Sequence, residues 1–160
     1  LDDDACRDLR LRHGFARAVP APIDWDESFR CGESRIDEQH RKLLADVNEL
    51  IRLGHQASVN LGDVADCAQR LLANASEHFA QEEQILAGLR YAELPRHRET
   101  HDGLLAKGRA LVTDLMNSVV TFEDVIRYFV HDLVMRHMLE ADRRFHPLVK
   151  GQASLRVANT

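Results

Sequence analysis

Histidine and carboxylate side chains lie on the apolar stripes of four segments whose residue spacing is typical of helices. The set comprises His40, His78, Glu82, His97, His101, His137 and Asp142. Burying ionisable groups is costly unless they are paired or bound to a metal ion. Any one of these histidines alone would be better explained as a hydrogen-bonded core or surface residue, but seven such residues together need a joint explanation. A site for two metal ions is the most economical one.

The residue types narrow the choice of metal. Imidazole and carboxylate ligands suit iron, manganese or zinc, and the absence of cysteine from the set argues against a thiolate zinc site or an iron–sulfur centre. Two ions bridged by Glu82 and Asp142 would use the five imidazoles as terminal ligands and would have room for an open coordination position. An open position on a redox-active metal allows a small ligand to bind.

Four amphipathic helices must position these side chains. Apolar residues at i, i+3 and i+4 spacing predict helices over about residues 37–53, 63–86, 95–116 and 121–145. Connections of roughly 5–9 residues favour antiparallel neighbours. We therefore expect an all-α fold, an up-down-up-down antiparallel four-helix bundle with an N-terminal extended arm. In that topology the seven residues all fall at one end of the bundle.

Spacing within the helices agrees with shared coordination. His78 and Glu82 are separated by i, i+4, as are His97 and His101, so each pair lies on one helix face. His137 and Asp142 are separated by i+5, which swings Asp142 about 140° round an ideal helix. If both are ligands, we expect a local widening or π-bulge there.

Composition excludes several classes of function. The chain has 160 residues, 21 Lys+Arg, 26 Asp+Glu and a net charge of -5. It shows no basic stripe, so nucleic acid is not expected as a partner. Its three cysteines, which are odd in number and in no CxxC motif, favour reduced thiols and a cytoplasmic location. No apolar run approaches the ~20 residues of a membrane span.

Domain organisation follows from the same pattern. Residues 1–23 mix charges with a Pro-Ala-Pro break and begin at Leu1 rather than Met, so we expect a linker or N-terminal arm that follows an upstream module. We assign residues 24–148 to the bundle and residues 149–160 to a C-terminal tail.

Four motifs resemble those of the bacterial hemerythrins. The segment from Trp25 to Asn48, which includes Phe29, Gly32 and Ile36-Asp37-Glu38-Gln39-His40, resembles the family's first-helix signature. The segment His78-Phe79-Ala80-Gln81-Glu82-Glu83 matches its H-F-x-x-E-E motif. His97-x-x-x-His101 and His137-x-x-x-x-Asp142 complete the pattern, which covers about residues 24–148.

The resemblance implies a diiron centre. One iron would be held by His97, His101 and His137, and the other by His40 and His78, with Glu82 and Asp142 bridging both. It also implies an oxo bridge between the irons and O2 binding at the iron that has two histidines.

Several functions remain open at this stage. The first is reversible O2 binding, by a carrier or storage protein or, as we prefer because of residues 1–23, by an oxygen or redox sensory domain of a signalling protein. The second is an enzyme, such as a peroxidase or a nitric-oxide-processing or iron-oxidising protein, although we expect no enzyme. The third is a structural or regulatory bundle that holds a redox-inert metal such as zinc. Nitric oxide and peroxide are alternative ligands.

The remaining polar residues carry no chemistry in this interpretation. We assign His13, His55, His131 and His146 to surface or linker roles and Glu83 to a solvated charge. Trp25 is expected to plug the open end of the bundle.

Overall fold

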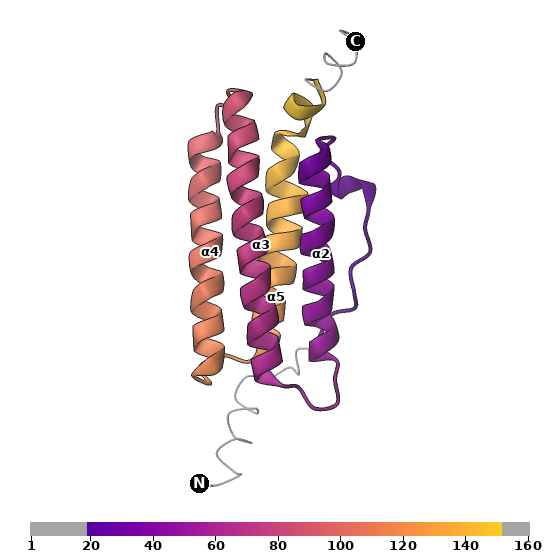
Figure 1. The fold of residues 1–160 in the computed structure, drawn as a ribbon, viewed down its shortest axis with the longest axis vertical. Helices are drawn as coiled ribbons and strands as arrows, with labels where there is room; N and C mark the ends of the chain where they lie inside the picture. The colour runs from indigo at the N-terminus through magenta and orange to yellow at the C-terminus, as the bar shows by residue number, and fades with distance from the viewer. Residues whose placement is uncertain (1–18, 152–160) are drawn as a thin grey trace.

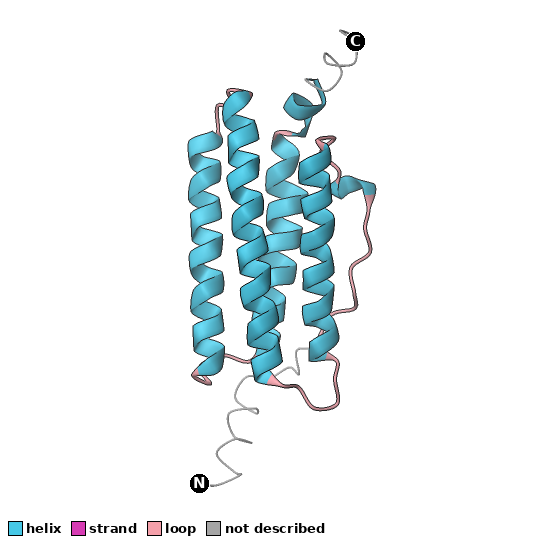
Figure 2. Cartoon of the chain, viewed as in Figure 1, coloured by secondary structure: helices cyan, strands magenta, loops and turns pink. Residues whose placement is uncertain are grey.

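Four helical columns form the protein. The structure is a computed structural model, and it describes residues 19–151. The columns are α2 (Ser34–Gly54), α3 (Leu61–Gly88), α4 (Leu94–Met116) and a fourth column that begins as α5 (Phe122–Tyr128). Figure 1 shows successive columns running in opposite directions, which confirms the predicted up-down-up-down bundle. Helices and loops account for all of residues 19–151 in Figure 2, and no strand occurs among them.

The helix ends have local causes. Asn60 caps α3 by accepting hydrogen bonds from the backbone N–H groups of Gly62 and Asp63. Thr121 and Asp124 form the capping box that the sequence predicts before α5. The α2 helix begins at Ser34, three residues before the predicted start, because the Glu33 side chain accepts from the N–H groups at the helix start.

The fourth column changes helix type along its length. After α5 it continues as η2, a π-helix over Phe129–Ala141, and ends in the 3-10 turn η3 over Asp142–Arg144. The sequence predicts a widening only between His137 and Asp142, and the structure extends it back to Phe129. A π-helical turn contains more residues than an α-helical turn, so it brings His137 and Asp142, which are five residues apart, toward the same face of the column.

Two apolar clusters lie on either side of the predicted metal ligands. The larger cluster fills the bundle and includes Leu43 and Leu133. The smaller cluster lies beyond the ligands and consists of Cys31, Ile36, Leu86, Leu94, Phe145 and Val149. The ligand layer is therefore closed off from water on both sides along the bundle axis. None of the helices in the described part of the chain has the length and apolar character needed to span a membrane.

The N-terminal arm, described here from residue 19 to residue 30, runs along α2 (Figure 1). Asn48 holds it through two hydrogen bonds: the amide donates to the Ile23 carbonyl and its oxygen accepts from the Ile23 N–H, both at 2.8 Å. His55 Nε2 lies 2.9 Å from the Pro20 carbonyl. Residues 1–18 of the predicted arm and residues 152–160 of the predicted tail lie outside the described residues. Val149, where we expect the tail to begin, is buried in the smaller cluster.

Candidate metal centre

All seven predicted side chains lie together at one end of the bundle, and all are buried. Each helical column supplies at least one: α2 His40, α3 His78 and Glu82, α4 His97 and His101, and the fourth column His137 and Asp142. They divide into two groups of ligand atoms, each within 4.8 Å of one another.

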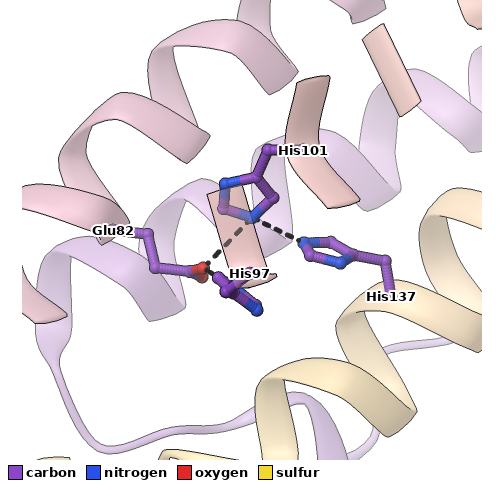
Figure 3. Close-up of side chains that lie close together, drawn as sticks. All are labelled: Glu82, His97, His101 and His137. Atoms are coloured by element: carbon purple, nitrogen blue, oxygen red, sulfur yellow. Dashed lines mark hydrogen bonds and ion pairs between the residues drawn. The ribbon is translucent and has the colours of Figure 1, made fainter. Parts of the chain in front are cut away.

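The first group contains Glu82, His97, His101 and His137 (Figure 3). His97 Nε2 lies 2.6 Å and His101 Nε2 3.4 Å from Glu82 Oε1. The Nε2 atoms of His101 and His137 are 3.1 Å apart. Metal–ligand bonds of roughly 2.0–2.2 Å place neighbouring ligand atoms about 3 Å apart, so these separations suit side chains arranged around one ion.

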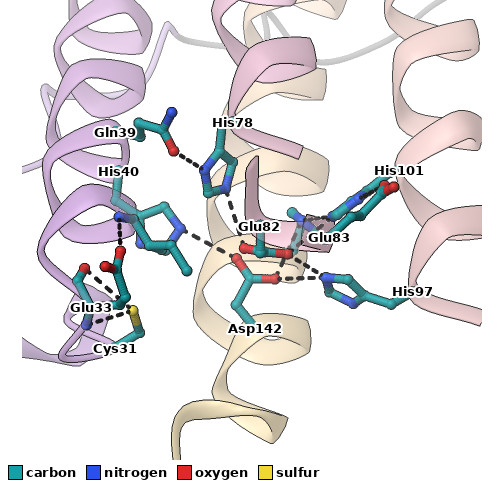
Figure 4. Close-up of polar contacts among 12 residues, drawn as sticks. Cys31, Glu33, Gln39, His40, His78, Glu82, Glu83, His97, His101 and Asp142 are labelled. Carbon is teal, nitrogen blue, oxygen red and sulfur yellow. Dashed lines mark hydrogen bonds and ion pairs between the residues drawn. The ribbon is translucent and has the colours of Figure 1, made fainter. Parts of the chain in front are cut away.

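The second group contains His40, His78, Glu82 and Asp142 (Figure 4). His40 Nε2 lies 3.4 Å from Asp142 Oδ2, and His78 Nε2 lies 3.4 Å from Glu82 Oε2. This group therefore has the same kind of spacing but one histidine fewer than the first.

The two carboxylates face both groups. Glu82 turns Oε1 toward His97 and His101 and Oε2 toward His78. Asp142 turns Oδ2 toward His40, while its Oδ1 lies 3.3 Å from His137 Nε2 and 3.6 Å from His97 Nε2. A carboxylate with one oxygen directed at each of two ions is a bridging ligand, so the geometry suits a pair of bridged ions.

Buried atoms without hydrogen-bond partners test whether the site fits metal ions. The side-chain atoms His40 Nε2, His78 Nε2, Glu82 Oε2 and both oxygens of Asp142 are buried and make no hydrogen bond. Buried polar groups are normally satisfied, because an unpaired one costs ~1–3 kcal/mol. Atoms of this kind converging at one point fit metal coordination, which satisfies them all at once.

Hydrogen bonds on the far side of three rings fix which nitrogen faces inward. The Nδ1 atoms of His40, His78 and His101 lie 3.0 Å from the Phe29 carbonyl, 3.2 Å from Gln39 Oε1 and 2.7 Å from Glu83 Oε1, respectively. Since each of these oxygens accepts, each Nδ1 carries the proton and donates. The neutral ring then leaves the Nε2 lone pair free to bind an ion.

The electrostatics at two of the histidines also favour ligation. Burial lowers the pKa of His137 to about 4, and burial and the neighbouring His40 hold the pKa of His78 well below its usual range. Both rings are therefore neutral near pH 7, as ligands must be. Burial and the Asp142 carboxylate raise the pKa of Glu82 to about 7. A bound cation would remove that repulsion between carboxylates.

An aromatic side chain orients the first group. The Phe79 ring stacks on His101 at a centroid distance of 3.9 Å and an interplanar angle of 4°. It also makes an edge contact with His137, with centroids 5.1 Å apart. Phe79 therefore fixes the planes of two rings in addition to filling the core.

Two side chains differ from the sequence prediction. His146, predicted to lie at the surface or in a linker, is buried, and its Nε2 atom has no hydrogen-bond partner. Glu83, predicted to be a solvated charge, accepts from His101 and from the Arg98 guanidinium. Glu83 is the second acidic residue of the H-F-x-x-E-E motif, and this motif is the sequence signal that could have identified its role. His55 and His131 are exposed, as predicted, and His13 lies outside the described residues.

Trp25 packs beside the bundle rather than inside the metal centre. Its ring is partly buried against the larger cluster, lies 5.5 Å from the Phe29 ring and carries the Arg41 guanidinium 4.2 Å above its centroid. These contacts give the side chain a structural role.

Fold and site together define a helical-bundle protein with a histidine-rich site for two cations. The Hemerythrin HHE cation binding domain model matches residues 31–149. A hemerythrin chain of Sipunculus nudus is 30% identical over 131 residues, which cover 82% of this chain and 97% of that protein. The bacteriohemerythrin of Clostridium acetobutylicum is 29% identical over 126 residues, covering 76% of this chain and 96% of the relative.

A solved structure has the same fold. The crystal structure of a wild-type hemerythrin superposes with a TM-score of 0.69 at 24% identity, covering 81% of this chain and 98% of the other. The chain belongs to the hemerythrin HHE cation-binding domain family. The two groups of His, Glu and Asp side chains are consistent with the diiron site of this family, in agreement with the predicted cofactor.

Proposed function

We propose that the seven side chains hold two iron ions and that the diiron centre binds O2 reversibly. The observation that carries this proposal is the pair of ligand groups joined by Glu82 and Asp142, whose buried atoms otherwise lack partners. When bound, the two irons supply the electrons that O2 takes up. The relatives named hemerythrin and bacteriohemerythrin support an oxygen-binding protein rather than an enzyme.

The unequal ligand sets indicate where O2 binds. Glu82 and Asp142 face both groups, so the position with His97, His101 and His137 has five protein ligands. The position with His40 and His78 has four. The second position therefore keeps the larger number of open coordination sites, and we assign O2 to it. This agrees with the assignment that the family resemblance implies.

An absorbance spectrum with iron quantification tests this proposal. We expect two irons per chain in anaerobically reduced protein and a visible charge-transfer band that develops with O2 and reverses when O2 is removed. His78→Ala should lower the iron content, whereas His131→Ala, at an exposed histidine outside the centre, should leave it unchanged. Iron that oxidises at once without a reversible band would favour a redox sensor or an enzyme, and a chain that binds no iron would favour zinc.

We further propose that the chain acts as an oxygen or redox sensory domain rather than as a stand-alone carrier or storage protein. The supporting observation is the hydrogen bond from His40 Nδ1 to the Phe29 carbonyl, because it joins a proposed iron ligand directly to the N-terminal arm. Phe29 is buried, and Asn48 fastens the same arm at Ile23. A change in the position of the His40 ring is therefore transmitted to the backbone that leads toward residue 1.

Hydrogen exchange of residues 19–30 tests the sensory role. We expect the exchange rates to differ between the reduced protein and the protein under O2. Asn48→Ala should raise exchange at the arm without changing the iron content, because Asn48 contacts the arm but no proposed ligand. Asn74→Ala, which removes a hydrogen bond to Asp46 on the α2–α3 surface, is the matched control. Equal arm exchange in the two states would favour a carrier or storage protein.

A further inference from the structure

The three anchored histidines have different kinds of acceptor at Nδ1, of which Gln39 and Glu83 are labelled in Figure 4. His40 donates to a backbone carbonyl at 3.0 Å and His78 to the Gln39 side-chain amide at 3.2 Å, and both acceptors are neutral. His101 donates to the Glu83 carboxylate at 2.7 Å. The two neutral acceptors serve the two-histidine position, whereas the charged acceptor serves the three-histidine position.

A charged acceptor changes the ligand it holds. A carboxylate draws the Nδ1 proton toward itself, which raises the electron density at Nε2 and the basicity of the ring. A more basic imidazole stabilises a metal ion of higher charge more than one of lower charge. The shorter distance at His101 agrees with a charge-assisted hydrogen bond.

The surroundings keep this interaction in place. The Phe79 ring stacks on His101, and the His101 side chain is almost wholly buried. Glu83 Oε2 lies 3.1 Å from Arg98 Nε, so its second oxygen is paired at the surface while Oε1 points inward. The Glu83 side chain is only 22% exposed, and partial burial weakens the screening of its charge by water.

We propose that Glu83 is a positioning residue that makes the two metal positions electronically unequal. This inference rests on the proposed diiron function. Through His101, Glu83 stabilises the ferric ion at the three-histidine position. In the iron-loaded protein, an external one-electron donor would therefore reduce the position at His40 and His78 first, because Glu83 would favour the oxidised state at the three-histidine position.

Two substitutions should reduce this asymmetry, one by acting on the three-histidine position and the other by acting on the two-histidine position. Glu83→Gln keeps an oxygen acceptor for His101 but removes its charge, so the three-histidine ion becomes easier to reduce. Gln39→Glu gives His78 a charged acceptor, so the two-histidine ion becomes harder to reduce. Glu99→Gln removes the same charge from an exposed position on α4, two residues before His101, and serves as the control.

A reductive titration followed by absorbance and electron paramagnetic resonance measures the mixed-valence state. The wild type should accumulate it at half reduction. Mutating the hydrogen-bond partner of a ligating histidine typically weakens metal binding by about 10–100-fold. Because Glu83→Gln removes the charge but keeps an oxygen acceptor, we expect a change at the lower end of that range, with the comproportionation constant falling by about tenfold. It should also fall in Gln39→Glu. A change of less than about twofold in Glu83→Gln, or an equal change in Glu99→Gln, would overturn the inference.

A second readout separates this inference from the proposed function. In zinc-loaded protein, the His101 Nδ1 proton should resonate further downfield than that of His78, and Glu83→Gln should remove the difference. Zinc retention of Glu83→Gln should fall by about tenfold. If the wild type binds no iron, the diiron function fails while the zinc measurements still test the role of Glu83. An unchanged Nδ1 resonance and unchanged zinc retention would show that Glu83 does not act through His101.

Discussion

We expect apolar side chains one helical turn from the ligands to exclude water from the centre. Leu133 lies four residues before His137 and is buried in the larger cluster. We predict that Leu133→Gln speeds autoxidation several-fold, because a polar side chain there admits water and protons to the open coordination position. The measurement is the rate at which reduced protein under O2 loses its reversible absorbance change. Leu133→Met, which conserves volume and polarity, should behave like the wild type.

If Leu133→Gln retains two irons and autoxidises no faster than Leu133→Met, water exclusion by this side chain is not what preserves the reversible form. The iron content of each variant separates this outcome from simple unfolding of the site.

The Cys31 thiol is predicted to be unreactive in the folded protein. It is fully buried in the smaller cluster, and burial raises its pKa to about 12, so almost none of the reactive thiolate is present at pH 8. Iodoacetamide should label the peptide containing Cys31 in denaturant but not in buffer, as followed by mass spectrometry. Rapid labelling of the folded protein would show that the small cluster opens readily.

Residue types and spacing were enough to predict that these seven side chains meet at one buried site, because ionisable groups on apolar stripes are conspicuous. They were not enough for Glu83. That residue follows Glu82 directly and therefore points about 100° away round the helix, so only the position of α4 brings His101 to it. The burial of His146 was missed because the His146-Pro147 pair indicates a helix end. The sequence does not show that Phe145 and Val149, on either side of this pair, pack into the smaller apolar cluster.

The helices approach each other closely where α4 carries Gly108. A Cβ added there would lie 2.5 Å from Leu72 Cδ2 and 3.2 Å from Tyr128 Cε1. We predict that Gly108→Ala lowers the free energy of unfolding by up to about 2 kcal/mol, because overpacking costs roughly 1–3 kcal/mol and the higher helix propensity of Ala offsets up to about 1 kcal/mol of it. Gly103→Ala, on the same helix with nothing within 4 Å of the new Cβ, should instead raise it by up to about 1 kcal/mol.

Urea unfolding of the two glycine variants checks this prediction. If both substitutions stabilise the protein equally, α4 is free to move away from Leu72 and Tyr128, and the close packing at Gly108 does not constrain the bundle.

The π-helix η2 is predicted to be a requirement for two-metal binding. Deleting the exposed Glu140 turns the His137–Asp142 spacing from i+5 to i+4 and moves Asp142 relative to the π-helical register. We expect the iron content to fall below two per chain while circular dichroism remains helical. Glu140→Ala should retain both irons. Full occupancy in the deletion variant would show that an α-helical turn can present Asp142 equally well.

Only part of η2 was predictable from the sequence. The i+5 spacing of two ligands requires a single widened turn between them. Upstream, Phe129 and Leu133 follow the same i, i+4 pattern as an α-helix. Apolar spacing of three and four residues therefore does not reveal where the π-helix begins.

For the whole molecule, iron and stability are coupled. The metal-free bundle must bury seven polar side chains, and several of their inward atoms lack partners. A ligand that binds only the folded state stabilises it by about 2.7 kcal/mol at a concentration 100 times its dissociation constant. We predict that removing iron by reduction and chelation lowers the melting temperature, and that adding back ferrous iron anaerobically restores it. Identical melting curves for loaded and metal-free protein would contradict this prediction.

The fourth helical column contributes to both metal positions, through His137 to one and through Asp142 to both. A ribosome makes this column after the other three helices, so a nascent chain that ends before residue 137 lacks ligands for both ions. Iron can therefore complete the centre only after nearly all of the bundle has been synthesised. Metal occupancy thus reports that translation has passed the last ligand.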